Sequence, residues 1–108
     1  MSPINLFSAV PGLAQGERFE ELLRHRNVVV ERIVSSPNIE DKLYNQPQDE
    51  WVVLLQGEAC LELDGKEVML CRGDNCFIPA HMPHRVVATS KEPCCIWLAI
   101  HIFADEQR

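Results

Sequence analysis

Residues 44–57 read Tyr-Asn-Gln-Pro-Gln-Asp-Glu-Trp-Val-Val-Leu-Leu-Gln-Gly, and residues 73–84 read Gly-Asp-Asn-Cys-Phe-Ile-Pro-Ala-His-Met-Pro-His. Each block places side chains of the kinds that bind metals next to an apolar run typical of a buried strand. Between the blocks, the dipeptide Asp64-Gly65 is a strong signal for a two-residue hairpin. We therefore expect folding to bring the two blocks together, and their meeting point is the predicted functional site.

The chain has the length and composition of one soluble globular domain. Its 108 residues are 46% hydrophobic and 24% charged, and the formal net charge is −6. An acidic chain without clustered Lys and Arg is a poor partner for nucleic acid or an anionic membrane. No stretch approaches the roughly 20 apolar residues of a membrane span, so we expect a cytoplasmic protein. The five cysteines are odd in number and lack Cys-x-x-Cys spacing, which disfavours a disulfide framework or a zinc knuckle.

Residues 1–27 are predicted to form an N-terminal arm and a short helix. Phe19, Leu22 and Leu23 would share one face of a helix that runs from Glu17 to Arg26. Acidic residues lead this segment and basic residues trail it, which is the order that the helix dipole favours. The remaining residues, 28–108, are predicted to form a β-barrel.

The pattern after residue 27 is that of short strands separated by turns. Segments rich in β-branched residues, or alternating between apolar and polar residues, indicate strands. The predicted strands cover 28–34, 51–55, 58–64, a return strand through Val68 and Leu70, 76–78, 85–87 and 95–103. This spacing indicates an all-β sandwich or small barrel.

Two of these strands are apolar on both faces, which is more than one small barrel can bury. They cover residues 51–55 and 96–103. A homodimer that packs through outward residues such as Trp51, Val53 or Trp97 would cover the surplus. We therefore predict self-association.

The spacing of the two blocks resembles that of the cupin superfamily. Six residues separate Glu50 from Gly57, five separate Gly73 from Pro79, and His84 follows. This arrangement is similar to the two motifs of small single-domain cupins of the phosphomannose-isomerase-like kind. The resemblance covers roughly residues 28–103, and it implies a double-stranded β-helix, a jelly-roll-like barrel.

The resemblance also implies a divalent-metal site in which two of the four ligands are changed. In the family, two histidines and a glutamate of the first motif join one histidine of the second. By spacing, Tyr44 and Gln46 occupy the two histidine positions, while Glu50 and His84 occupy the others. If His81 turns inward it supplies a third strong ligand, and the set would suit zinc, iron or manganese. If His81 turns outward, the remainder favours a loosely held hard ion or none.

Other polar residues are candidates for contacts with a ligand. Tyr44 and Gln46 would hydrogen-bond it, and Arg85 would suit a phosphate or carboxylate, with a surface salt bridge as the alternative. His101 would line the barrel if its strand face points inward, and would otherwise be a core or interface histidine.

Two functions are consistent with these residues. The first is a metal-assisted isomerase that acts on a small polar metabolite, such as a sugar or sugar phosphate, with Glu50, His81 and Tyr44 as catalytic groups. The second is a non-catalytic cupin that has weakened or lost its metal and binds a small ligand for sensing or storage. Oxygen chemistry is disfavoured, because it usually needs more imidazole ligands than these positions supply.

Overall fold

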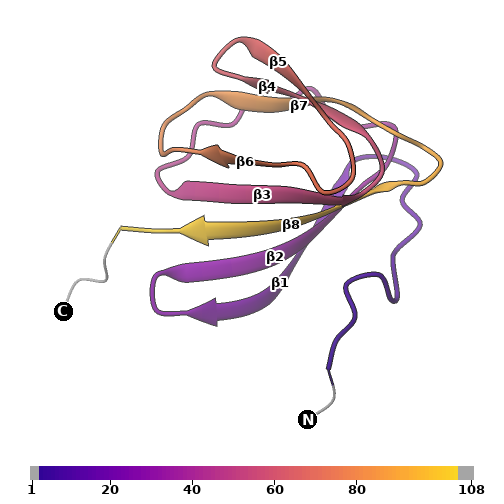
Figure 1. Cartoon of the computed structure of the whole chain (residues 1–108), viewed down its shortest axis with the longest axis horizontal. Helices are drawn as coiled ribbons and strands as arrows, with labels where there is room; N and C mark the ends of the chain where they lie inside the picture. The colour runs from indigo at the N-terminus through magenta and orange to yellow at the C-terminus, as the bar shows by residue number, and fades with distance from the viewer. Residues whose placement is uncertain (1–2, 105–108) are drawn as a thin grey trace.

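The computed structural model of the chain describes residues 3–104, and within that range it contains eight β-strands and no helix. A five-stranded sheet has the order β1-β2-β8-β3-β6, and a three-stranded sheet has the order β5-β4-β7. The strands are β1 (Glu17–His25), β2 (Val28–Ser35), β3 (Asp49–Gln56), β4 (Ala59–Leu63), β5 (Lys66–Leu70), β6 (Asn75–Ile78), β7 (His84–Thr89) and β8 (Cys95–Ile102). Neighbouring strands are antiparallel throughout. Figure 1 shows the two sheets facing each other as the walls of a barrel, so the predicted all-β barrel is confirmed.

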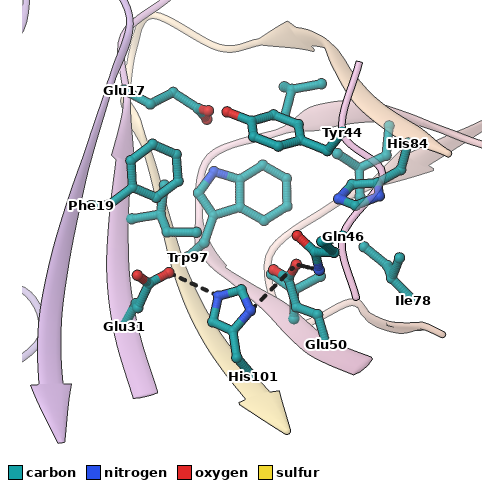
Figure 2. A pocket seen from close by; sticks show the side chains of 14 residues that line it. Glu17, Phe19, Glu31, Tyr44, Gln46, Glu50, Ile78, His84, Trp97 and His101 are labelled. Carbon is teal, nitrogen blue, oxygen red and sulfur yellow. Dashed lines mark hydrogen bonds and ion pairs between the residues drawn. The ribbon is translucent and has the colours of Figure 1, made fainter. Parts of the chain in front are cut away.

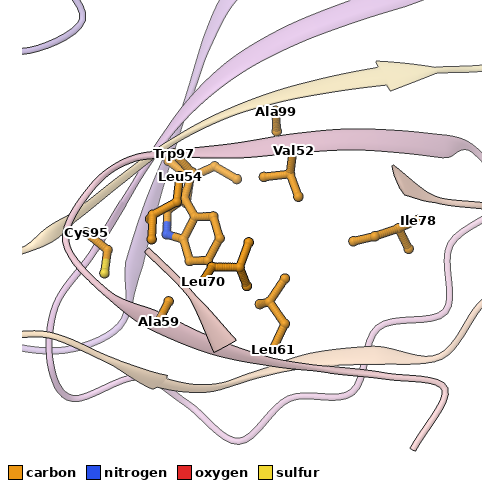
Figure 3. Close-up of a cluster of buried hydrophobic side chains, with 10 residues drawn as sticks. Val52, Leu54, Ala59, Leu61, Leu70, Ile78, Cys95, Trp97 and Ala99 are labelled. Carbon is orange, nitrogen blue, oxygen red and sulfur yellow. The ribbon is translucent and has the colours of Figure 1, made fainter. Parts of the chain in front are cut away.

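The alternation of side chains along the strands separates an inner face from an outer one. On β3, Val52 and Leu54 point inward and are buried, and the outward Trp51 and Val53 are half-buried. The inward residues of both sheets meet in one hydrophobic core (Figure 3). Its buried members are Ile33, Val52, Leu54, Ala59, Leu61, Leu70, Ile78, Cys95, Trp97 and Ala99. Within residues 3–104, no helix is long and apolar enough to cross a membrane.

The helix predicted from Glu17 to Arg26 is wrong, because this segment is the edge strand β1. It pairs with β2 from Glu17 opposite Ser35 to His25 opposite Val28. The pairing register shifts between Glu21 and Leu23, which marks a β-bulge. A bulge breaks the two-residue alternation of a strand, so the apolar residues of this segment acquire a spacing that imitates a helix.

Tight turns at glycine connect the strands as the sequence predicts. Asp64 and Gly65 both have positive φ, 50° and 82°, as a type I′ hairpin between β4 and β5 requires. Gly57, between β3 and β4, has a φ of 93°. A side chain there would collide with Cys95 and Ser90. Its Cβ atom would lie 2.8 Å from Cys95 Sγ and 2.8 Å from Ser90 Oγ.

Arg32 on β2 anchors the N-terminal arm to the outer face of the large sheet. Its side chain is buried, and Nε lies 2.6 Å from Glu20 Oε1 on β1. The same guanidinium donates hydrogen bonds to the backbone carbonyls of Leu6, Ser8 and Ala9 at 3.0, 2.7 and 3.2 Å. One buried cation thus orders a segment that forms no strand.

Trp97 cannot serve the predicted dimer contact, because it points into the barrel. It is 3% exposed, and its indole Nε1 donates to Ser35 Oγ at 3.0 Å. Trp51 and Val53 lie on the outer face, opposite Ile100 and Leu98 of β8. They remain available for a contact with another chain.

Candidate functional site

A cavity lies inside the barrel, between the inner face of the large sheet and the strand β7. Its volume is about 90 Å³. Residues that the sequence places far apart converge on it, as Figure 2 shows. It is lined by Glu17, Phe19, Glu31, Ile33, Tyr44, Gln46, Glu50, Val52, Leu61, Ile78, His84, Val86, Trp97 and His101.

Tyr44 and His84 form one wall of the cavity as a stacked pair. Their backbones hydrogen-bond in both directions, at 2.7 and 3.0 Å, and their ring centroids are 5.6 Å apart. Burial raises the pKa of the Tyr44 phenol, and the charges of Glu17, Glu40 and Glu50 raise it further. Tyr44 is therefore a neutral phenol at physiological pH.

The hydrogen bond at Nδ1 of His84 determines what its ring offers to the cavity. His84 is 8% exposed, and Nδ1 lies 3.0 Å from the carbonyl oxygen of Met82. Because a carbonyl only accepts, Nδ1 carries a proton, and in the neutral ring Nε2 then keeps its lone pair. Among the described residues Nε2 has no hydrogen-bond partner, so in that form it is an acceptor available to a ligand.

Glu50 lies on the inner face of β3, with 7% of its surface exposed. Gln46 Nε2 donates a hydrogen bond to Glu50 Oε1 at 2.9 Å. The neighbouring Asp49 Oδ1 accepts the Ala80 amide at 2.8 Å, which ties the start of β3 to the loop before β7. The two sequence blocks are thus joined, as predicted.

His101 on β8 lies between two carboxylates of the neighbouring strands. Its Nε2 is 2.9 Å from Glu31 Oε1, and its Nδ1 is 3.2 Å from Gln48 Nε2 and 4.0 Å from Glu50 Oε1. The hydrogen bond with Glu31 raises the pKa of His101, burial opposes this, and the charge of Glu50 adds to the rise. Both ring nitrogens have protein partners, Glu31 at Nε2 and Gln48 at Nδ1. The role of His101 is therefore to position neighbouring side chains rather than to contact a ligand.

Glu17 on β1 is a further acid of the cavity. Its carboxylate is hydrogen-bonded to the hydroxyl of Ser35, and in Figure 2 it faces the phenol of Tyr44. Burial raises the pKa of Glu17, the Ser35 hydrogen bond opposes this, and the charge of Glu50 raises it again. Within residues 3–104 Glu17 forms no ion pair, although Lys42 lines a neighbouring pocket with it. A buried carboxyl group outside an ion pair is a candidate functional group.

Sequence reasoning missed Glu17 and Glu31. Glu17 was assigned to a helix, so its inward direction was hidden. The sequence does carry a signal at Glu31. It lies on the same strand face as the buried Val29 and Ile33, and an acid on an otherwise apolar strand face is unusual. Trp97 and Phe19, which supply aromatic walls, were also not predicted to face a site.

His81 and Arg85, two predicted site residues, lie outside the cavity. His81 is exposed in a turn with a φ of 67°, and its backbone amide donates to the Gln46 carbonyl at 2.8 Å. Arg85 alternates with His84 on β7 and points outward, where Nη1 lies 2.6 Å from Asp41 Oδ1. His81 is therefore not positioned to be a third metal ligand or a proton carrier. Arg85 is not positioned to bind an anion in the cavity.

The donor set does not fit a tightly held zinc, manganese or iron ion. Within residues 3–104, no group of three or more His, Cys, Asp or Glu side chains is arranged to hold a metal ion. Of the predicted ligands, Gln46 presents its NH₂ group to Glu50, and His81 points away. Glu50 and His84 remain, and two strong ligands seldom hold a transition metal tightly.

Comparison with known proteins gives the family. The sequence model of the cupin domain matches residues 35–102, so the chain belongs to the cupin family. No curated protein matches the chain. A protein from Ralstonia eutropha JMP134 with the provisional name mannose-6-phosphate isomerase is 37% identical. Its solved structure has a TM-score of 0.84, and the alignment covers 96% of this chain and 100% of that one.

More distant structures share the fold alone. A cupin superfamily protein from Desulfitobacterium hafniense DCB-2 is 20% identical, with a TM-score of 0.78 and coverage of 95% and 92%. An RmlC-like cupin from Shewanella frigidimarina NCIMB 400 is 19% identical, with a TM-score of 0.74 and coverage of 96% and 91%. The predicted cupin barrel is therefore confirmed.

Proposed function

We propose that this cupin binds a small polar metabolite in the barrel cavity, with His84 and Glu50 as its polar anchors. The observation that carries the proposal is the state of His84. Its ring is buried, its Nδ1 proton is committed to the Met82 carbonyl, and its Nε2 has no partner among residues 3–104. In the neutral ring this atom is an acceptor that a donor bound in the cavity can reach.

The test is a binding screen with matched histidine variants. Ligand-observed NMR against short polyols, amines, aldoses and carboxylates would identify binders. His84→Phe keeps the ring stacked on Tyr44 and removes the acceptor, so binding should be lost, and Glu50→Gln should weaken it. His81→Phe changes an exposed histidine three residues away and should have no effect. Equal binding by the wild type and His84→Phe would contradict the proposal.

A second candidate function is proton transfer of the isomerase type on the same bound metabolite. It is favoured by the fixed tautomer of His84, because Nε2 is a base held in one orientation, and by the neutral phenol of Tyr44 beside it. His84 would remove the proton from the hydroxyl-bearing carbon next to a carbonyl while Tyr44 donates its proton to the carbonyl oxygen, which gives an enediol. The Tyr44 phenolate would then take the proton of the other hydroxyl as protonated His84 returns its proton to the former carbonyl carbon, which restores both side chains. The provisional name of the Ralstonia protein supports the same class of reaction.

Solvent isotope incorporation would test this second function. Small hydroxyaldehydes and hydroxyketones incubated with the protein in D₂O should gain deuterium at the carbon next to the carbonyl. The exchange should disappear in His84→Phe and persist in His81→Phe. Binding without exchange would leave the chain as a binding cupin.

We also propose that the chain forms a homodimer through the outer face of the large sheet. Trp51 and Val53 are half-buried there beside Leu98 and Ile100, and Phe77 of β6 is 52% exposed opposite Trp51. Burial of this apolar surface would favour association. Light scattering should give twice the chain mass, and Phe77→Glu should halve it. A wild-type mass equal to one chain at micromolar concentration would refute the dimer.

A further inference from the structure

We propose that the cavity selects a small organic cation, one that carries an ammonium group on a short apolar body. This inference rests on the proposed function, because it names the class of ligand for the same cavity. It is supported by three carboxylates and three aromatic rings that surround one space in Figure 2: Glu17, Glu31, Glu50, Phe19, Tyr44 and Trp97.

The charge of the lining favours a cation. No Lys or Arg occurs among the lining residues, whereas three glutamates do. His101 is shared between two of them, since its Nε2 bonds to Glu31 at 2.9 Å and its Nδ1 lies 4.0 Å from Glu50 Oε1. Lys42 lies 4.9 Å from the centroid of the Tyr44 ring, and it lines the adjoining pocket with Glu17 and Glu40 rather than this cavity. A cationic ligand would add counter-charge to a cavity in which three glutamates share one histidine.

The hydrogen-bonding atoms that remain free favour a donor-rich ligand. His84 Nε2 is an acceptor because Nδ1 carries the proton. The NH₂ group of Gln46 is already committed to Glu50 Oε1, which leaves the second Glu50 oxygen without a partner in the described part of the chain. An ammonium group offers three donors and no acceptor, so it complements these atoms.

The aromatic rings and the apolar floor suit the body of such a ligand. Trp97 is 3% exposed and forms a wall inside the barrel, while Phe19, at the edge strand β1, lies half-exposed nearer the mouth. Aromatic faces attract ammonium groups within about 6 Å. Aliphatic lining residues, which would contact alkyl carbons, are Ile33, Val52, Leu61, Ile78 and Val86.

Size and charge disfavour a sugar phosphate as the ligand. The cavity volume of about 90 Å³ is well below the roughly 300 Å³ at which pockets for drug-sized ligands begin. The one arginine predicted to bind a phosphate, Arg85, points outward and pairs with Asp41 and Glu62. A phosphate would therefore meet carboxylates without a compensating cation.

Calorimetric titration with three probes of similar size would test the charge preference directly. The probes are isopropylammonium chloride, 2-propanol and sodium acetate at pH 7 and low salt, with zinc and manganese chloride as separate titrants. We expect the ammonium probe to bind at least about tenfold more tightly than the alcohol, and acetate to show no binding. Glu17→Gln and Glu50→Gln should each reduce the preference, whereas Glu67→Gln, which removes an exposed acid on β5, should not.

Each other outcome has a defined meaning. Equal binding of the alcohol and the ammonium probe would overturn the cation preference and leave the proposed cavity function intact. Failure of all three organic probes to bind would overturn both. Binding of zinc or manganese ions without binding of isopropylammonium would show an inorganic cation site and would also overturn the inference. Thermal unfolding of each variant confirms that it is folded.

Discussion

Glu50 on β3 and His101 on β8 are paired directly across the large sheet, and their side chains approach to 4.0 Å on its inner face. His101 also bonds to Glu31 on β2, so three adjacent strands contribute one polar group each to the cavity. The three groups are therefore electrostatically coupled across the sheet. A substitution at one of them should change the pKa of His101 or the interactions of the remaining groups.

The Glu31–His101 bond should make stability depend on pH near neutrality. Its hydrogen bond raises the pKa of His101 above the usual value of 6.5. The stabilisation is therefore complete below pH 6.5 and is lost as pH rises through the folded-state pKa. Urea unfolding at pH 6 and pH 8.5 should show lower stability at the higher pH, and Glu31→Gln should flatten this difference. An unchanged pH profile in the variant would contradict the assignment.

Glu17 should reduce stability when it is ionised. Burial raises its pKa above the usual 4.5, so the folded state binds the proton more tightly than the unfolded state does. Its unfavourable effect is absent below the unfolded-state pKa and grows as pH rises through the folded-state pKa. Glu17→Gln should therefore raise the unfolding free energy at pH 7 and change it little at pH 4. Destabilisation at pH 7 would show that the Glu17 carboxylate is stabilising.

Gly57 should tolerate no side chain. Gly57→Ala should lower the unfolding free energy by about 2–4 kcal/mol, because alanine is strained at positive φ and its Cβ would overlap Cys95 and Ser90. Gly65→Ala is the matched control. It shares the positive φ but meets nothing within 4 Å, so we expect only about 1–2 kcal/mol. Denaturant unfolding measures both, and equal losses would contradict the close approach.

A histidine in place of Gln46 should create a metal site. Gln46 contacts Glu50 at 2.9 Å and lines the cavity with His84, so Gln46→His would bring a third strong ligand to that pair. We expect affinity for zinc or manganese to rise by at least about tenfold, measured by calorimetry. His81→Gln should leave metal binding in this variant unchanged, because His81 is exposed. Unaltered affinity would mean that residue 46 does not face the other ligands.

The barrel was predictable because its strands from residue 28 onward carry clear alternation and its turns carry Asp64-Gly65 and Gly57. The strand β1 was not, because its bulge disrupts the two-residue alternation by which a strand is identified.

The candidate site was predictable only where spacing along a strand settles the direction of a side chain. Glu50 and His84, predicted at the meeting point of the two blocks, both line the cavity. The direction of His81 depends on the backbone of a turn, where φ is 67°. The inward position of Glu17 depends on the register between β1 and β2, which the sequence does not display.

Long-range ¹H–¹⁵N NMR of the histidine rings tests the central claim most directly, namely that His84 presents a free Nε2 to the ligand of the cavity. We predict that His84 carries its proton on Nδ1, and that its Nε2 resonance shifts when isopropylammonium is added, while the resonances of His81 do not. A proton on Nε2 of His84, or an Nε2 resonance that a bound ligand leaves unmoved, would contradict the account.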